Sequence, residues 1–180
     1  MGVTRRRLPH IYSPGQTLFV TFHLAGSLPV SRRFPAGAIN SGEAFVVMDR
    51  LLDASQSGPR WLAEARIAVL VRDSIYHCGV TDYDLHAWVI MPNHVHMLIT
   101  PRTLPSRFMR RLKGFTARQA NAILFRAGKP FWQDETYDHV VRSPREFHLT
   151  ANYIAENPVK AGLVRAAEEF RWSSVASIRG

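Results

Sequence analysis

Two histidines separated by one residue, His94 and His96, are the pair whose type and spacing most directly suggest chemistry. On a β-strand, residues i and i+2 project from the same face, so the two imidazoles could bind one divalent metal ion together. The same spacing also fits two half-exposed histidines on a solvated sheet face. The three-residue pattern alone leaves both interpretations open.

A tyrosine and an asparagine four residues apart form the second candidate group. On a helix, Asn157 lies about 40° around the axis from Tyr153, on a face that differs from the apolar stripe of Phe147 and Ile154. A tyrosine at a helix edge is most often a packing residue. Combined with two imidazoles, however, a phenol and an amide oxygen are the parts needed for metal-assisted attack on a phosphodiester, with the phenolate as nucleophile.

Basic residues form the third group, on a helix predicted from about residue 103 to residue 127. No acidic residue lies between Ser106 and Lys129 to pair with them. A helix face with unpaired positive charge favours a phosphate backbone over an ordinary solvated surface. The candidate DNA contacts are Arg107, Arg110, Arg111, Lys113 and Arg118 on this helix, and Arg5, Arg6 and Arg7 near the N-terminus.

Composition narrows the class of protein. The chain has 180 residues and a net charge of +9, which favours a polyanionic partner. Its single cysteine, Cys78, excludes an internal disulfide and is typical of the cytoplasm. The apolar runs are far shorter than the ~20 residues of a membrane helix, so no membrane partner is expected. We expect one domain over residues 1–180, with a basic arm over 1–16 and a C-terminal extension over 163–180.

Residue patterning predicts the elements that must position these groups. The expected strands cover residues 18–24, 83–91 and 94–100, with a further short strand within 131–141, and the expected helices cover about 43–52, 59–79, 103–127 and 143–157. Phe108, Leu112 and Phe115 are expected in the buried stripe of the third helix, and Pro158 is expected to end the fourth. This order favours an α+β fold, a ferredoxin-like antiparallel sheet with helices packed on it.

Several separate motifs, in order along the chain, resemble one known family. By them the chain resembles the REP-associated tyrosine transposases of bacteria, within the HUH single-strand transposases, and the likeness runs nearly from end to end. The motifs are Arg6-Arg7-Leu8-Pro9-His10, Phe19-Val20-Thr21-Phe22-His23-Leu24, Val89-Ile90-Met91-Pro92-Asn93-His94-Val95-His96-Met97-Leu98-Ile99, Leu112-Lys113-Gly114-Phe115-Thr116-Ala117, Phe131-Trp132-Gln133, Tyr137-Asp138-His139, Tyr153-Ile154-Ala155-Glu156-Asn157-Pro158-Val159-Lys160-Ala161-Gly162 and Trp172-Ser173-Ser174.

The resemblance implies a ferredoxin-like domain that cuts and rejoins single-stranded DNA at hairpin-forming repeats. It implies that His94 and His96 are metal ligands and that Tyr153 is the nucleophile, which forms a 5′-phosphotyrosine and frees a 3′-hydroxyl. Asn157 matches the position of a third ligand, with Glu156 as the alternative. Mg²⁺ or Mn²⁺ is the expected ion, although two imidazoles also suit zinc.

The resemblance also sets expectations for partners and location. Single-stranded DNA hairpins are the expected partners of a monomer or homodimer, in the bacterial cytoplasm in association with the nucleoid. Tyr137 is the rival nucleophile, and Tyr153 is preferred because it lies on a capped helix, whereas Tyr137 falls in an irregular stretch. Two alternatives stay open: a catalytically silent nucleic-acid-binding module of the same fold, and a small zinc hydrolase that uses water as nucleophile.

Overall fold

The computed structural model of the chain describes residues 15–28, 51–53 and 58–177. The basic arm with Arg5, Arg6 and Arg7 lies outside the described residues. So does most of the helix predicted over residues 43–52, of which residues 51 and 52 are described; they are helical together with residue 53. None of the described helices combines the length and the apolar composition needed to span a bilayer.

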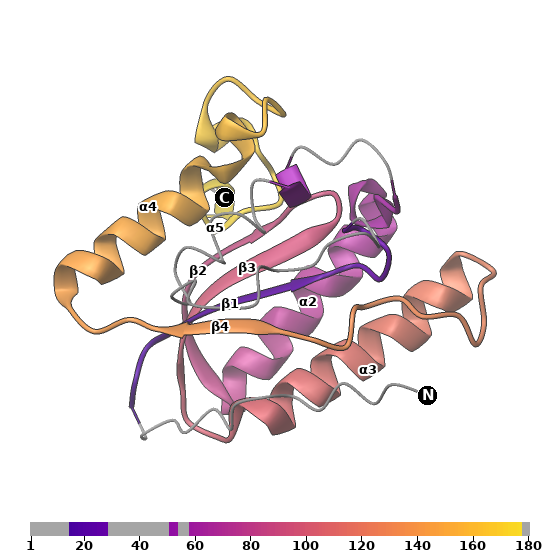
Figure 1. Cartoon of the computed structure of the whole chain (residues 1–180), viewed down its shortest axis with the longest axis horizontal. Helices are drawn as coiled ribbons and strands as arrows, with labels where there is room; N and C mark the ends of the chain where they lie inside the picture. Colours follow the sequence, from indigo (N-terminus) through magenta and orange to yellow (C-terminus); the bar gives the residue numbers. More distant parts are fainter. Residues whose placement is uncertain (1–14, 29–50, 54–57, 178–180) are drawn as a thin grey trace, which may run out of the picture.

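The centre of the fold is a four-stranded antiparallel sheet (Figure 1). Its strands are β1 (Leu18–His23), β2 (Tyr83–Ile90), β3 (His94–Pro101) and β4 (Tyr137–Val140). They lie in the order β2-β3-β1-β4, and every neighbouring pair is antiparallel. The predicted strands are confirmed to within a few residues, because alternating apolar side chains specify a pleated segment locally.

Helices cover both faces of the sheet. The helices α2 (Ala65–Thr81) and α3 (Pro105–Ile123) pack on one face, and α4 (Pro144–Lys160) packs on the other (Figure 1). The order β1-α2-β2-β3-α3-β4, with β3 and β1 at the centre of the sheet, is the ferredoxin-like arrangement expected from the sequence. The remaining short elements are η1 (Trp61–Ala63), η2 (Ala167–Glu169) and α5 (Ser174–Ser177).

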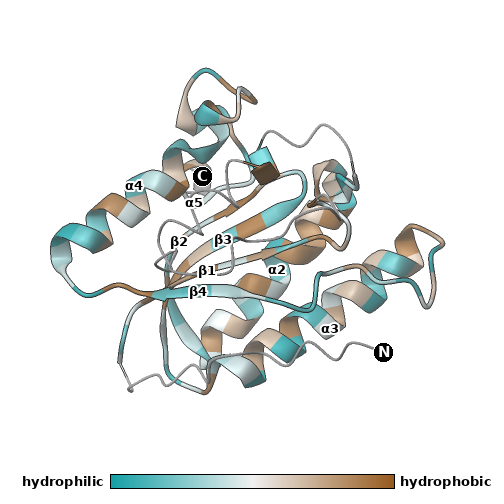
Figure 2. Cartoon of the chain, viewed as in Figure 1, coloured by the Kyte–Doolittle hydropathy of each residue, from teal (hydrophilic) through white to brown (hydrophobic). Residues whose placement is uncertain are grey.

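Alternation along the two central strands divides the core into two clusters. Figure 2 colours the ribbon by hydropathy and shows apolar residues along both of these strands. Val95 and Met97 of β3 point toward α2 and α3, together with Val20 of β1. Leu98 of β3 and Phe19 of β1 point the other way, toward α4. His94 and His96 alternate with Val95 and Met97, so they share the α4 side of the sheet.

The C-terminal segment closes the outer edge of the sheet. The amide of Ile90 donates to the carbonyl of Trp172 at 2.8 Å, and Ser173 forms a bridge with Val89. The hydroxyl of Ser174 accepts from the amide of Trp88 at 3.1 Å. Within the predicted extension over 163–180, residues 172–174 are therefore packed against β2.

The end of α4 corrects one prediction. The helix continues through Pro158 to Lys160 instead of ending near Asn157. A proline lacks an amide hydrogen, but Asn157 and Pro158 are both buried, and packing against the sheet offsets the lost helical bond. The last turn is closed by amides of Ala161 and Leu163, which donate to Asn157 and Pro158 at 3.0 and 2.9 Å.

Two other helices also differ from expectation. The helix predicted from residue 59 begins as the 3-10 turn η1, and α2 starts only at Ala65. The helix predicted to residue 127 ends at Ile123, because Phe125 adopts a left-handed backbone with φ of 53°. Phe115, expected in its buried stripe, is 43% exposed, whereas Phe108 and Leu112 are buried as expected.

Candidate active site

His94 and His96 lie on β3, an inner strand, and neither is exposed to solvent. Across the sheet, His96 is paired with Thr21 of β1 and Val89 of β2, and His94 is paired with His23. The alternative of two half-exposed histidines on a solvated face is therefore wrong. The two rings are buried, so each nitrogen needs a hydrogen-bond partner or a ligand.

The contacts of His94 determine which of its nitrogens carries the proton. Its Nδ1 lies 2.7 Å from Oδ1 of Asn93, and Nδ2 of the same amide donates to the carbonyl of Leu52 at 2.8 Å. Oδ1 only accepts, so Nδ1 of His94 donates. Burial, followed by the neighbouring His96 and His23, holds the pKa of His94 well below its usual range. The imidazole is neutral, and its Nε2 presents a lone pair.

The Nε2 atom of His96 faces the Nε2 atom of His94. These two atoms lie 3.1 Å apart, and Nδ1 of His96 lies 2.7 Å from Oγ1 of Thr21. Two ligands at about 2.1 Å from one ion lie about 3.0 Å apart in adjacent octahedral positions and about 3.4 Å apart in tetrahedral ones. The spacing therefore fits a shared divalent ion, and Asn93 and Thr21 would hold the rings as outer partners of the ligands.

Tyr153 approaches this pair from α4. Its ring centroid lies 5.9 Å from that of His96 and 6.0 Å from that of Phe19, edge-on in both cases. The ring is half-buried, and Nζ of Lys160 lies 4.8 Å from its centroid. The helix is positioned by its N-terminus, where the Ser143 hydroxyl accepts from the amide of Glu146 at 3.1 Å, as its Ser-Pro-x-Glu sequence predicts. A phenol and two imidazoles thus meet on one face of the sheet.

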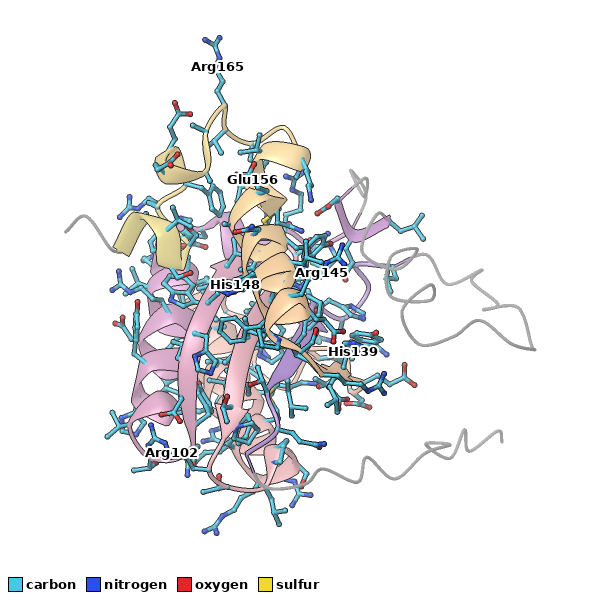
Figure 3. All side chains as sticks on the ribbon, turned by 90° about the vertical axis from the view of Figure 1, so that its left-hand side faces the viewer. Arg102, His139, Arg145, His148, Glu156 and Arg165 are labelled. Atoms are coloured by element: carbon cyan, nitrogen blue, oxygen red, sulfur yellow. The ribbon has the colours of Figure 1, made fainter. Side chains whose placement is uncertain are left out.

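Asn157 and Glu156, the two candidates for a third ligand on α4, lie in different environments. Asn157 is fully buried, and within the described residues neither atom of its amide has a hydrogen-bond partner. An orphaned buried amide is costly, and a bound cation is one way to satisfy its oxygen. Glu156 is exposed on α4, where it is labelled in Figure 3. Burial favours the amide over the carboxylate as the ligand from this helix.

Tyr137 is placed differently from the sequence-based expectation. It is the first residue of β4 and pairs with Thr21, which in turn pairs with His96. Paired residues share a face, so Tyr137 also lies on the α4 side, two strands and therefore about 10 Å from His96. Tyr137 therefore lies in a regular strand and not in an irregular stretch. Tyr153 remains the preferred candidate for the nucleophile, because its ring contacts that of His96 directly.

Asp53 is a neighbour that the sequence analysis missed. Its Oδ1 lies 3.9 Å from Nε2 of His94. No local pattern marks this residue, because only the tertiary fold brings it to β3. Within the described residues, no three side chains of His, Cys, Asp or Glu are already gathered as a complete metal site. A site here would use the amide of Asn157 or a movement of Asp53.

The predicted basic stripe lies on α3, which covers the opposite face of the sheet from His94 and His96. Two of its members have structural partners. Arg111 forms an ion pair with the buried carboxylate of Asp82, at the end of α2. Nζ of Lys113 donates to the carbonyls of Gln133 and Asp134 at 2.7 and 3.0 Å and thereby anchors the segment before β4. The exposed remainder of the stripe is Arg107, Arg110 and Arg118.

The partnership of Arg111 with Asp82 leads to a stability prediction. Arg111→Ala is expected to lower the free energy of unfolding by about 2 kcal/mol, because it leaves a buried carboxylate with one partner fewer. Arg107→Ala, an exposed change one turn earlier, is expected to cost under about 0.5 kcal/mol. Urea denaturation followed by circular dichroism measures both. Equal effects of the two variants would contradict a structural role for Arg111.

The α4 side also carries cationic groups. Figure 3 looks onto this side and labels Arg145 and His148 along α4, with Arg165 and Arg102 at opposite ends of the molecule. Arg145 and Arg165 are exposed, whereas Arg102 donates to Asp84 at 2.6 Å. Arg145 and Arg165 could not be recognised as such groups from the sequence, because they form no continuous basic run.

Comparisons with known proteins point in the direction that the motifs indicated. Residues 69–157 match the family model described as transposase IS200 like. Over 92 residues the chain is 26% identical to the REP-associated tyrosine transposase of Escherichia coli K12, a match that spans 51% of this chain and only 54% of that relative. A solved structure of a REP-associated tyrosine transposase bound to a REP hairpin superposes with a TM-score of 0.64 at 20% identity, covering 96% of this chain and 84% of that one.

Proposed function

Because this chain is a relative of the REP-associated tyrosine transposases and carries the IS200-like match over residues 69–157, we propose that it cuts and rejoins single-stranded DNA at hairpin-forming sequences. The observation that supports this most is the meeting of Tyr153 with the His94–His96 pair. A phenol beside two converging imidazole nitrogens that could bind a metal ion is suited to attack on a phosphodiester.

In the proposed reaction Tyr153 is the nucleophile. Its phenolic oxygen bonds to the phosphorus, the bond from phosphorus to the 3′-oxygen breaks, and the phenol proton passes to solvent while the leaving oxygen takes up a proton. The products are a 5′-phosphotyrosine and a free 3′-hydroxyl. The reverse attack by a 3′-hydroxyl reseals a strand without a nucleotide cofactor, because the covalent link keeps the energy of the broken ester.

His94 and His96 would hold a divalent ion, Mg²⁺ or Mn²⁺, with Asn157 as the proposed third ligand. Such an ion supplies neutralisation of charge on the scissile phosphate. Asn93 and Thr21 keep the imidazole rings oriented through their Nδ1 atoms. The edge-on contact of Tyr153 with Phe19 and His96 limits the positions that the phenol can adopt.

The arginines of α3 are proposed to act in DNA affinity and not at the reacting phosphate, because α3 covers the other face of the sheet. We expect the triple variant R107A/R110A/R118A to weaken hairpin binding and to reduce the slope of log K against log[salt] by about 3, close to one unit per lost phosphate contact. Fluorescence anisotropy at several salt concentrations measures the slope.

Arg66→Ala is the matched control for that prediction, since Arg66 is exposed on α2 and forms an ion pair with Glu64. It should leave the slope unchanged. An unchanged slope in the triple variant would exclude α3 as a DNA-binding surface, without bearing on the chemistry at Tyr153.

The proposed activity is tested with a labelled single-stranded hairpin taken from repeats that flank the gene. With Mn²⁺ present, the expected product is a protein–DNA adduct that survives denaturing electrophoresis. Binding without adduct or cleavage would favour the catalytically silent module. Cleavage without an adduct, and with water as nucleophile, would favour the zinc hydrolase.

A further inference from the structure

Asp53 lies beside the imidazole pair from a part of the chain distant in sequence. We infer that its carboxylate is a ligand of the divalent ion held by His94 and His96, in addition to the amide of Asn157. The inference rests on the metal site in the proposed function and adds to it a residue that no motif marks.

The position of Asp53 is set by its neighbour in the chain. Leu52 is 1% exposed and packs in the cluster on the α4 side of the sheet. The carbonyl of Leu52 accepts from Nδ2 of Asn93, whose Oδ1 binds Nδ1 of His94. Two hydrogen bonds through Asn93 therefore join the backbone carbonyl of Leu52 to the ring of His94. They hold the backbone next to Asp53 in place relative to His94.

The distance from Asp53 to His94 suits two ligands of one ion. Oδ1 lies 3.9 Å from Nε2 of His94, the nitrogen that also faces His96. Ligands at about 2.1 Å from an ion lie about 3.0 Å apart when adjacent and about 4.2 Å apart when opposite. The distance of 3.9 Å lies between these two values, so the carboxylate is within the range expected for two ligands of a shared ion.

Charge gives the second reason for this assignment. An imidazole that binds a metal ion is neutral, and the amide of Asn157 carries no charge, so these ligands leave a buried dication without an anion. Asp53 supplies a negative charge, and its side chain is only 19% exposed. A carboxylate oxygen also shifts the preference of the site from zinc toward Mn²⁺ or Mg²⁺, which favour oxygen ligands.

The test measures metal binding by the full-length protein without DNA, using Mn²⁺ and Zn²⁺ as probes. Electron paramagnetic resonance of unbound Mn²⁺ gives the Mn²⁺ affinity, and calorimetry gives the Zn²⁺ affinity. Asp53→Asn is expected to weaken Mn²⁺ binding at least about tenfold and Zn²⁺ binding less, because the imidazoles dominate zinc affinity. Asp73→Asn, an exposed aspartate paired with Arg72 on α2, is the control and should leave both affinities unchanged.

Asp53→Ala is measured in parallel, with circular dichroism melting of each variant, and should match Asp53→Asn in losing more Mn²⁺ than Zn²⁺ affinity. Mn²⁺ affinity within about twofold of the unmodified protein in either folded variant overturns the inference. Absence of Mn²⁺ binding by the unmodified protein overturns it too. Because no DNA is present, failure here is distinguishable from failure of the adduct assay, which tests Tyr153.

Discussion

Replacing Tyr153 by phenylalanine is expected to abolish both cleavage of the hairpin and the covalent adduct. A phenyl ring has no oxygen to attack phosphorus, and loss of a catalytic nucleophile typically lowers turnover by about 10⁶-fold. Time courses with labelled hairpin, resolved on denaturing gels, measure both products. The half-buried ring keeps its contacts with Phe19 and His96, so the fold and hairpin binding should be retained.

Tyr137→Phe is the matched control, because Tyr137 lies on the same face of the sheet but two strands from His96. It should form the adduct at close to the unmodified rate. The opposite result, an adduct with Tyr153→Phe and none with Tyr137→Phe, would identify Tyr137 of β4 as the nucleophile. Hydrolysis that persists in both variants would point to water as the nucleophile.

Replacing His94 or His96 by alanine is expected to remove metal-dependent cleavage. Metal stabilisation of transition-state charge contributes several kcal/mol, so the rate should fall by at least about three orders of magnitude. Both imidazoles are fully buried, and alanine leaves a cavity that costs about 2–4 kcal/mol. His94→Gln and His96→Gln fill more of that space and are measured in parallel, with cleavage rates titrated against Mn²⁺.

Hairpin affinity separates this effect from a general loss of structure. In folded variants, anisotropy should give a hairpin affinity close to that of the unmodified protein, because the α3 arginines lie on the other face of the sheet. His148→Gln, an exposed change on α4, should leave cleavage unchanged. Full activity in both His94 and His96 variants would remove the metal site from the mechanism.

Much of the fold follows from local patterns. Alternation in β3 predicted that Val95 and Met97 face one way and the histidines the other, because side chains on a strand project to opposite faces in turn. The Ser-Pro-x-Glu start of α4 was likewise predictable, since capping depends on residues three apart. The order of these elements then indicated the ferredoxin-like sheet.

Other features depend on contacts that no local pattern encodes. Burial of Asn157 and Pro158 against the sheet carries α4 past a residue that disfavours helix. Arg111 belongs to the same predicted basic stripe as Arg107, yet Asp82 at the end of α2 pairs with Arg111. The local sequence predicts neither the extra turn of α4 nor the choice of Arg111 over Arg107, because the contacting residues lie on other elements of the fold.

Reading the residues in order is enough to find the chemical groups of this protein, and strand and helix periodicity is enough to predict which of them share a face. Their surroundings come from packing: the fold buries His94 and His96 beneath α4, brings Tyr153 against His96, and places Asp53 beside His94. Periodicity acts over a few residues, whereas burial and the distances between candidate ligands depend on how distant segments pack.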